Sequence, residues 1–515
     1  MNCGDKIIGV LDIKGHIYGS HNGKYQYLFK PLDKNMDKLL VYTGINRIDS
    51  PGDILCIVEK IQMTSNCLDN KYGHGKLINK IGYTDNLMDL ITSWIYFYKL
   101  EQCTRSGFKF RIKDNHTENS HLEIHTDEKI CSVDPLNCTD IDDCFHYVKI
   151  DGIYHIYIHI SNVAYHILNN FVSENCLKLM LDKPFSLYLP HNKSYHMLHA
   201  TLVGQLSLTV GQIRNVITLE LLVDESGNIF DHKFYENKII NKNQYTYNDV
   251  DSMIGNNNQY WIGIRDILKL VNSNYIGHIT RESSDSHQII ETLMIIYNKF
   301  ATKYLINANQ VPILRVHHTT NSDPHVSITC DDLSNYLKYL EYSSAYYELY
   351  DSSKIQSHFG LNCDLYGHFT SPIRRCVDIF NQLIMSQQLN NSTVQNFSEI
   401  INIDSIYRIN CIEKQFRKLY RKIRLFELYD KYKNKLVEDL VYLYSDDLKS
   451  IRYYWPSGNI GGRVKLGITD ELSINDKLAI LTRDGIEHKI ALYSKNRVKM
   501  VIVLEVVPRL IIEII

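Results

Sequence analysis

Four carboxylates stand close together in the segment DPLNCTDIDD, at Asp134, Asp140, Asp142 and Asp143. Carboxylates at this spacing repel one another, so a fold that keeps them together needs a counter-charge. A hard divalent cation such as Mg²⁺ supplies it, because Mg²⁺ prefers oxygen ligands and is often held by few carboxylates together with substrate phosphates. Such ions favour phosphodiester cleavage. The alternative that this spacing leaves open is a solvated acidic turn with an aspartate helix cap.

Two adjacent arginines follow far along the chain, in the segment YGHFTSPIRRCVD. The signal at Thr370–Pro372 predicts the start of a helix, which places Arg374 and Arg375 in its first turn. A positive charge there faces the unfavourable end of the helix dipole, so a role other than helix stability is indicated. The guanidinium fork matches phosphate and carboxylate groups. The alternative is a structural pair of arginines bound to Asp378 or Asp364.

A third charged feature is the run KQFRKLYRKIR at 414–424, which has six basic residues and no acidic one. Apolar residues recur in it at helical spacing, and the predicted buried stripe comprises Phe416, Leu419, Ile423 and Phe426. The basic face of such a helix suits the backbone of a nucleic acid. A solvated helix face is the alternative.

The whole chain is nevertheless close to neutral, with 56 Lys and Arg against 58 Asp and Glu in 515 residues. This balance, together with 44% hydrophobic residues, excludes a disordered chain and a strongly basic polyelectrolyte. It argues against a partner held by bulk charge, such as chromatin or an anionic membrane. The length predicts about three domains.

The twelve cysteines include no CxxC pair, and Cys131, Cys138 and Cys144 are spaced too widely for a zinc knuckle. Reduced thiols in a cytosolic compartment are therefore expected. The N-terminus lacks the apolar core of a secretion signal. Charged residues interrupt the apolar run at 498–515, which predicts buried strands and not a membrane span. We expect a soluble cytoplasmic protein without a membrane partner, and a nuclear location stays open.

The elements that would position these groups begin with an N-terminal region, 1–129. Five β-rich runs between about residues 5 and 60 predict a small barrel of the OB or cold-shock type, although another small β domain fits the pattern equally well. A helix is expected over Asn86–Leu100. The polar stretch 113–129 is expected to be a linker.

The second domain, 130–433, opens with predicted strands over 147–167, whose alternation suits a sheet with one solvated face. Further strands are expected at 216–223 and 230–235. Helices are expected at 261–271, 287–307, 331–350, 378–388 and 406–432. The polar stretch 387–395 is expected to be a loop. The third domain, 434–515, should begin with a helical segment and continue as a small β domain, with strands near 461–466, 476–482 and 499–506.

Read in order, these segments resemble the RNB catalytic domain of the ribonuclease II and ribonuclease R family over about residues 130–433. The four aspartates match the acidic motif of the family without a gap. Further segments that resemble family motifs are HISNVAYHI, FSLYLP, QLSLTVGQIR, IIETLMIIYN, ILRVHH and HFGL. The segment HFTSPIRR reproduces its family motif almost letter for letter.

This resemblance implies an α+β multidomain fold, in which a central RNB domain with a mixed sheet and helices is flanked by small OB-like β-barrel domains. The N-terminal barrel region would bind RNA, and the C-terminal domain would be a diverged S1-type domain. The implied activity is processive 3′-to-5′ hydrolysis of single-stranded RNA to nucleoside 5′-monophosphates. The implied cofactor is Mg²⁺, as one or two ions, with Mn²⁺ as a substitute.

The four aspartates take their roles from the same resemblance. Asp134, Asp140 and Asp143 match positions implicated in Mg²⁺ binding. Asp142 belongs to the same metal-binding set and matches the carboxylate that is tied most directly to the chemistry.

The resemblance also assigns residues that would contact RNA. Arg374 matches the arginine that holds the phosphate and is counted with the catalytic residues, and Arg375 stands beside it. Tyr188 matches an aromatic residue that clamps the terminal nucleotide, since a flat ring stacks on any base. Glu291 aligns with an acidic position near the RNA end.

The sequence departs from the family pattern at several positions. Asn162 stands in place of an aspartate, Lys183 in place of an arginine and Gln382 in place of a histidine. The segment 315–368 is shorter than is usual in the family. None of these changes touches the four aspartates, so an active enzyme is expected.

The sequence leaves two alternatives. One is a catalytically silent RNA-binding regulator on the same scaffold, and the other is a metal-dependent DNA nuclease, which the resemblance disfavours. Whether the chain acts as a monomer or as a subunit of a larger RNA-decay assembly is left open.

Overall fold

A computed structural model of the chain describes the following residues: 6–61, 72–112, 122–170, 172–276, 284–318, 345–391, 397, 399–432, 435–445, 450–458, 460–464, 471–475, 478–483, 485–504 and 508–514. The chain forms two compact units. The terminal unit includes residues 1–101 and 414–515, and the central unit includes residues 102–322 and 338–413.

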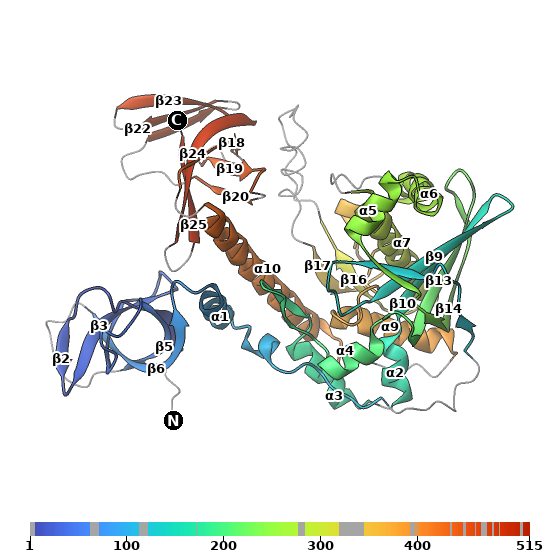
Figure 1. Cartoon of the computed structure of the whole chain (residues 1–515), viewed down its shortest axis with the longest axis horizontal. Helices are drawn as coiled ribbons and strands as arrows, with labels where there is room; N and C mark the ends of the chain where they lie inside the picture. Colours follow the sequence, from blue (N-terminus) through green and yellow to red (C-terminus); the bar gives the residue numbers. More distant parts are fainter. Residues whose placement is uncertain are drawn as a thin grey trace. The chain divides into compact units, whose positions relative to one another are not determined.

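The N-terminal part of the terminal unit is a six-stranded sheet in the order β1-β5-β6-β4-β3-β2, which the additional pairing of β1 with β3 closes into a barrel (Figure 1). Its strands are β1 (Lys6–Leu11), β2 (Gly19–His21), β3 (Lys24–Pro31), β4 (Leu39–Thr43), β5 (Ile54–Ile61) and β6 (Gly73–Tyr83). The five predicted strands are confirmed. The sixth strand, β6, escaped prediction because its sequence, GHGKLINKIGY, buries few side chains and lacks an apolar alternation.

Helix α1 (Leu87–Phe97) confirms the predicted helix. It begins where the Asn86 side chain accepts a hydrogen bond from the backbone N–H of Asp89, as an N-cap residue does. Ile91 and Trp94 of this helix are buried.

The C-terminal part of the terminal unit has two sheets, in the orders β20-β19-β18-β24-β25 and β21-β22-β23. Its strands are β18 (Val437–Tyr444), β19 (Arg452–Trp455), β20 (Ile460–Arg463), β21 (Glu471–Asn475), β22 (Leu478–Arg483), β23 (Ile486–Ala491), β24 (Ser494–Leu504) and β25 (Pro508–Ile514). The predicted helical segment after residue 434 is wrong, because VEDLVYLY forms β18. Trp455 is fully buried in the core of this part.

The central unit is built on a seven-stranded sheet in the order β15-β8-β9-β10-β13-β14-β7. These strands are β7 (Ile124–His125), β8 (Cys131–Asp134), β9 (Asp143–Ile150), β10 (Ile153–Ser161), β13 (Ile213–Val223), β14 (Ile229–Ile240) and β15 (Asn243–Thr246). Two two-stranded antiparallel sheets pair β11 (Leu187–Leu189) with β12 (Lys193–Tyr195) and β16 (Ile313–Val316) with β17 (Tyr346–Leu349).

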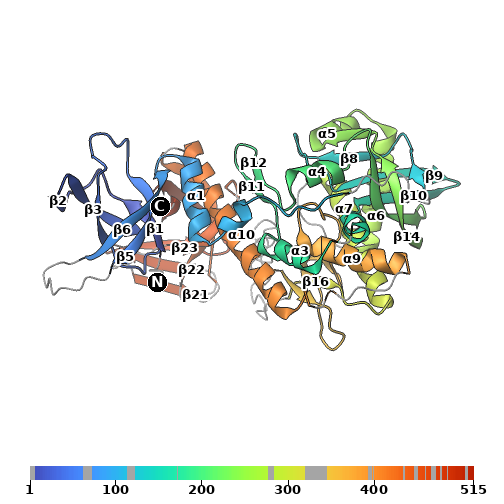
Figure 2. The ribbon, with the colours of Figure 1, turned by 90° about the horizontal axis from the view of Figure 1, so that it is seen from below.

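The helices of this unit include α2 (Val163–Asn169), α3 (Glu174–Lys178), α4 (Ala200–Leu206), α5 (Tyr247–Gly255), α6 (Gln259–Tyr275), α7 (Asp285–Asn307) and α9 (Cys376–Leu389). Helix α10 (Ile403–Tyr432) starts in the central unit and ends in the terminal unit. Helices α5, α6 and α7 cover one face of the large sheet with the main hydrophobic core, as Figures 1 and 2 show.

Both faces of the sheet are covered near its centre, which corrects the expectation of one solvated face. Ile158, His159, Ile160 and Ser161 follow one another in β10, and all four are buried. The even-numbered residues pack in the main core. A smaller apolar cluster on the sheet includes Cys144 of β9 and Val216 of β13.

Several element predictions in the central unit are wrong. The segment VAYHI forms helix α2 and not a strand, because Asn162 caps it as a helix. The supposed linker contains β7, which pairs with β14, so the sheet begins before residue 130. Of the helix predicted at 331–350, residues 346–349 form a strand, and residues 331–344 lie outside the described residues. Gln387–Leu389 continue α9.

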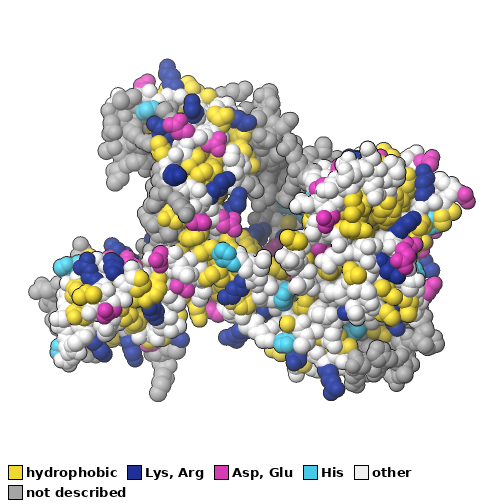
Figure 3. Space-filling model, in the orientation of Figure 1, with side chains coloured by type: hydrophobic (Ala, Val, Ile, Leu, Met, Phe, Trp, Pro, Cys, Tyr) yellow, Lys and Arg dark blue, Asp and Glu magenta, His cyan; other side chains and the backbone are white. Residues whose placement is uncertain are grey.

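The buried stripe predicted for the basic helix is confirmed in α10. Phe416, Leu419, Ile423 and Phe426 are all buried. On the surface shown in Figure 3, Lys and Arg side chains alternate with Asp and Glu side chains, in keeping with the neutral composition. Among the described residues, no helix is both long enough and apolar enough to cross a membrane.

A chain of buried polar side chains crosses the large sheet. His146 Nδ1 lies 3.1 Å from His159 Nε2, and His159 Nδ1 lies 2.8 Å from Thr218 Oγ1, which donates to Asn237 Oδ1. Burial lowers the pKa of His146 to about 4 and also lowers that of His159. Both rings are therefore neutral in the folded protein at neutral pH.

This chain predicts a loss of stability in acid. An unfolded histidine takes up a proton below about pH 6.5, whereas folded His146 does so only near pH 4. Between these two values, the contribution of His146 to the free energy of unfolding therefore falls by about 1.4 kcal/mol for each unit by which the pH is lowered. Denaturant unfolding of the wild type and of His146→Gln should be compared at pH 7.5, 6 and 5. The variant should show a shallower loss, and an identical pH dependence would contradict the assignment. Buried aspartates with raised pKa values contribute the opposite pH dependence of stability, and because both proteins contain them, this contribution cancels in the comparison.

Candidate active site

The acidic segment connects two neighbouring strands of the large sheet. Strand β8 ends at Asp134 and the adjacent β9 begins at Asp143, so the two carboxylates start from the same edge of the sheet. Ile141 anchors the connecting turn: it is buried, its N–H donates to Ser207 Oγ at 2.8 Å, and its carbonyl accepts from Leu208 N at 2.9 Å. This anchoring keeps the flanking Asp140 and Asp142 inside the protein, so the alternative of a solvated turn is wrong.

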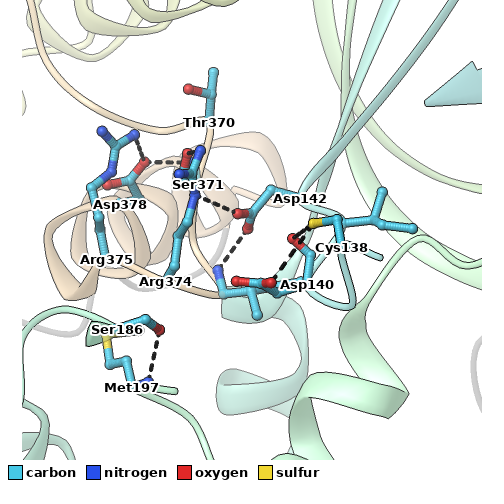
Figure 4. A network of polar contacts seen from close by, with 12 residues as sticks. Cys138, Asp140, Asp142, Ser186, Met197, Thr370, Ser371, Arg374, Arg375 and Asp378 are labelled. Atoms are coloured by element: carbon cyan, nitrogen blue, oxygen red, sulfur yellow. Dashed lines mark hydrogen bonds and ion pairs between the residues drawn. The ribbon is translucent and has the colours of Figure 1, made fainter. Parts of the chain in front are cut away.

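Asp142 is 2% exposed and bound on both carboxylate oxygens. Its Oδ1 accepts the backbone N–H of Ile373 at 2.8 Å, and its Oδ2 accepts Arg374 Nε at 3.2 Å (Figure 4). Burial raises the pKa of Asp142, while Arg374 and the Ile373 N–H oppose that rise. The two predicted catalytic residues, 232 positions apart in the sequence, are thus in direct contact.

Asp140 has a different environment. Its Oδ2 accepts the hydroxyl hydrogen of Tyr188 and lies 3.8 Å from His196 Nδ1. Its Oδ1 lies 3.8 Å from Cys138 Sγ, which donates weakly to it (Figure 4). The predicted nucleotide clamp therefore contacts the acidic cluster directly.

Asp134 and Asp143 carry the strongest sign of unmet negative charge. Burial raises the pKa of Asp134 to about 6, and burial followed by the charge of Asp134 raises the pKa of Asp143 to about 7. Asp134 Oδ2 is buried and has no hydrogen-bond partner among the described residues. A cation between these two carboxylates would offset their burial.

The turn that carries the arginine pair precedes helix α9. The predicted helix start at Thr370–Pro372 is wrong, because α9 begins at Cys376 and Arg374 lies before it. Asp378, which is fully buried, accepts the backbone N–H of Ser371 at 2.7 Å and thereby shapes the turn. Ser371 Oγ then accepts Arg374 Nη2 at 3.0 Å.

The two arginines point to different partners, as Figure 4 shows. Arg375 Nη2 binds Asp378 Oδ1 at 2.8 Å, which is the structural pairing named as the alternative. Arg374, whose side chain is 49% exposed, binds Asp142 and keeps part of its guanidinium open to solvent. Arg374 is thus the better placed of the two to meet a phosphate, and an RNA contact of Arg375 stays a prediction.

Backbone pairing brings Tyr188 beside this turn. Ser186 N donates to the Arg374 carbonyl at 3.0 Å, and Cys376 N donates to the Pro184 carbonyl at 2.9 Å. Tyr188 follows in the short strand β11, between the buried Leu187 and Leu189, and its side chain is 38% exposed. A half-exposed ring next to Arg374 suits stacking on a base.

The position of Glu291 depends on helix α7. Glu291 is half-buried and lies one helical turn after His287, whose ring stacks on Tyr247 at a centroid distance of 3.9 Å. Tyr247 follows β15, which pairs in parallel with β8 so that Thr246 is aligned with Asp134. Glu291 therefore lies on the same helix as His287, which stacks on Tyr247, and its role stays a prediction.

Three residues near the aspartates were missed in the sequence. Cys138 lies inside the acidic segment, and His196 lies shortly after the FSLYLP segment. Both therefore stand at or near segments that the sequence singles out, although neither residue type by itself indicates a role there. Tyr247 offered none, because only the parallel pairing of β15 with β8 brings it to Asp134.

Two of the departures from the family pattern, at Asn162 and Gln382, have structural explanations. Asn162 is buried, its Oδ1 accepts the N–H of Tyr165 at 2.8 Å, and its Nδ2 donates to Glu236 Oε1 at 2.8 Å. Gln382 Nε2 donates to the carbonyls of Ser161 at 3.0 Å and Phe369 at 3.3 Å, which links strand β10 to the segment before the arginine turn. The side-chain amides of Asn162 and Gln382 thus hold backbone segments in place around the site.

Restoring the family aspartate at position 162 should destabilise this protein. Asn162→Asp places a buried carboxylate against Glu236 in place of the donating amide, which should cost about 1–3 kcal/mol of unfolding free energy. The double variant Asn162→Asp with Glu236→Gln should recover most of the loss, because a glutamine amide can donate to the new carboxylate. Urea unfolding at pH 7.5 measures both. An Asn162→Asp variant as stable as the wild type would contradict this pairing.

Comparison with protein-family models matches the chain to the RNB domain over residues 125–270 and 264–391, which together cover half of its length. The chain belongs to the RNB domain family. The match includes the four aspartates, Tyr188 and both arginines, and it starts at strand β7, in agreement with the sheet.

RNB relatives of this chain include proteins named ribonuclease R. That of Aquifex aeolicus is 24% identical over 332 residues, which are 52% of this chain and 46% of the relative. A probable exosome complex exonuclease, RRP44, of Caenorhabditis elegans is 24% identical over 474 residues, 76% of this chain and 48% of the relative. The matched part of the chain thus spans about half the length of these relatives.

Solved structures of RNB proteins share the fold. The RNase R of Mycoplasma genitalium, solved in complex with ribose methylated single-stranded RNA, aligns with a TM-score of 0.75 at 16% identity, covering 99% of this chain and 90% of that one. Yeast Ssd1, described as a pseudonuclease, aligns with a TM-score of 0.74 at 13% identity, covering 99% and 83%. The expected α+β fold with OB-like domains around a central RNB domain is confirmed.

The RNB family implies a divalent cation, and the acidic side chains of this site can be compared with the ligands that such a cation needs. Among the described residues, no three His, Cys, Asp or Glu side chains converge closely enough to form a finished metal site. The donor chemistry fits a hard cation, because the charge of Asp134 acts on Asp143 and, in the described part of the chain, the buried Asp134 Oδ2 has no hydrogen-bond partner. Asp134 and Asp143 are the residues that would hold it.

Proposed function

We propose that this chain is a divalent-cation-dependent 3′-to-5′ exoribonuclease that hydrolyses single-stranded RNA processively to nucleoside 5′-monophosphates. The observation that carries the proposal is the contact between Asp142 and Arg374, with Tyr188 on the neighbouring Asp140. Membership of the RNB family and similarity to ribonuclease R proteins support it.

In this proposal the side chains divide the work by charge and shape. Tyr188 stacks on the terminal base, so binding tolerates any sequence. Arg374 donates to the phosphate with the part of its guanidinium that Asp142 leaves open, and Asp142 fixes the direction of that group. Mg²⁺ held by Asp134 and Asp143, when bound, would supply Lewis-acid stabilisation of the charge that develops on the phosphate, and Mn²⁺ would substitute.

A catalytically silent RNA-binding regulator is the second candidate, and the similarity to Ssd1 favours it. Against it stands the complete set of four aspartates in this chain, of which Asp140 and Asp142 are buried and Asp134 and Asp143 are half-buried, with Arg374 paired to Asp142. Such a costly arrangement is hard to explain by RNA binding alone, since like charges repel both one another and phosphates.

The test is an incubation of RNA and DNA oligonucleotides of the same sequence with the purified chain and Mg²⁺. Mononucleotides should appear from RNA, none should appear from DNA, and chelation of the cation should stop the reaction. RNA that is bound and stays intact would support the silent regulator instead. A sizing measurement on the same sample decides between a monomer and a subunit of an RNA-decay assembly.

A further inference from the structure

Asp140 differs from Asp134 in what surrounds its carboxylate. It is 8% exposed, and the chain donates to both of its oxygens: the Tyr188 hydroxyl to Oδ2 and Cys138 Sγ to Oδ1. His196 Nδ1 lies 3.8 Å from Oδ2, too far for a hydrogen bond. Asp134, in contrast, has a buried oxygen without a hydrogen-bond partner among the described residues. The lone pairs of Asp140 are thus directed at the side of the cluster where the aromatic ring stands.

Tyr188 needs such a support for its ring. Strand β11 has three residues in a short hairpin, and the two leucines that flank Tyr188 are buried, whereas Tyr188 is 38% exposed. The ring of His196 packs edge-on against it, at a centroid distance of 6.2 Å and an interplanar angle of 84°. His196 Nε2 is in turn within 3.1 Å of Ser194 Oγ on β12.

The hydroxyl of Tyr188 fixes the remaining freedom of the side chain. A tyrosine ring turns about two torsions, and a hydrogen bond from its far end to a buried carboxylate restricts both. A ring that is held in place before binding loses less entropy when it stacks on a base. The contact with Asp140 therefore adds to RNA affinity without touching RNA.

We propose that Asp140 is a positioning residue of the nucleotide clamp: it accepts the Tyr188 hydroxyl, with His196 as a lateral support, and so sets the direction in which the ring meets the terminal base. This inference rests on the proposed function, because it assumes that Tyr188 binds RNA. It separates two roles within Tyr188, in which the ring contacts the base and the hydroxyl contacts the protein. It also gives Asp140 a task that is distinct from holding a cation.

The experiment measures the affinity for a fully 2′-O-methylated single-stranded RNA, by fluorescence anisotropy and with chelator present, so that no cleavage intervenes. Tyr188→Phe keeps the ring and removes the hydroxyl. It is measured with Asp140 present and with Asp140→Ala, as a double-mutant cycle. Removing the hydroxyl should weaken binding about fivefold when Asp140 is present and less than about twofold when residue 140 is alanine.

The matched control repeats the cycle with Asp134→Ala, which removes an equal charge from the same cluster. In this control cycle, Tyr188→Phe should weaken RNA binding about fivefold both with Asp134 present and with Asp134→Ala. Asp140→Asn, which retains an oxygen acceptor, should restore part of the dependence on the hydroxyl. An equal effect of Tyr188→Phe in both residue-140 backgrounds, or no effect in the wild type, would overturn the proposal. Thermal melting of each variant confirms that it is folded.

Failure of this inference and failure of the proposed function can be told apart. The methylated RNA reports only binding, whereas degradation of an unmodified RNA by the wild type reports catalysis. A wild type that binds but never degrades RNA would overturn the proposed nuclease activity. The double-mutant cycle could still be interpreted in that case, because it measures only binding. A wild type that degrades RNA, with independent effects at positions 140 and 188, would overturn the clamp support alone.

Discussion

Asp142→Asn is expected to lower the rate of RNA hydrolysis at least about a thousandfold. The substitution keeps the size of the side chain and removes its charge. One asparagine oxygen can still accept the Ile373 N–H, but the amide group then turns its own hydrogens toward Arg374 Nε, which is also a donor. The loss therefore combines a missing charge beside the phosphate with a displaced arginine.

Single-turnover hydrolysis of a labelled RNA measures this effect. Asp364→Asn serves as the matched control, since Asp364 is an exposed carboxylate in the same unit, and it should react like the wild type. Binding of a 2′-O-methylated RNA to Asp142→Asn should weaken by far less than the rate falls. A rate within about tenfold of the wild type would remove Asp142 from the chemistry.

Arg374→Ala should lower kcat/KM about a hundredfold to a thousandfold, as the loss of one donor to a developing phosphate charge does. Arg374→Lys should recover only part of this, because an ammonium group cannot bind Asp142, Ser371 and a phosphate at once as the guanidinium fork can. The lysine variant thus separates the effect of charge from that of geometry.

Arg408→Ala is the control for this prediction. Arg408 forms a surface ion pair with Asp182 in the same unit, with a side chain that is 55% exposed, and such pairs contribute little. Its kcat/KM should stay within about twofold of the wild type. Equal activities of Arg374→Lys and the wild type would contradict the geometric role of Arg374.

The sequence predicted those parts of the fold that have a strong local signal. The apolar alternation in β9 and β10 and the helical spacing in α10 both reflect a buried face, and both were predicted. The exceptions have the opposite property: β6 buries few side chains, and β18 begins with an alternation that resembles a polar helix face. Helix α2 was missed because its start depends on the cap at Asn162, inside an apolar run.

The candidate site was predictable as a set of residues but not as a set of contacts. The acidic segment and the arginine pair carry their own local patterns. The ion pair between Asp142 and Arg374, the hydroxyl of Tyr188 on Asp140 and the link of Asn162 to Glu236 join residues that are far apart in the sequence. No local pattern encodes such pairs, because each depends on how the sheet and the arginine turn pack together.

The same geometry gives the near-neutral composition a specific meaning. The acidic cluster and Arg374 lie together, with Asp142 paired to Arg374, so charges of both signs that the overall balance conceals are concentrated in one place. A neutral protein can therefore bind RNA through a small charged site, with a salt dependence set by few contacts.

The most direct measurement uses a single-stranded RNA that carries one label at its 5′ end and another in its 3′-terminal nucleotide, incubated with the wild-type chain and Mg²⁺. The 3′ label should appear at once as a nucleoside 5′-monophosphate, while the 5′ label stays in an oligonucleotide that shortens. An RNA that is bound tightly and keeps both labels would contradict the nuclease assignment.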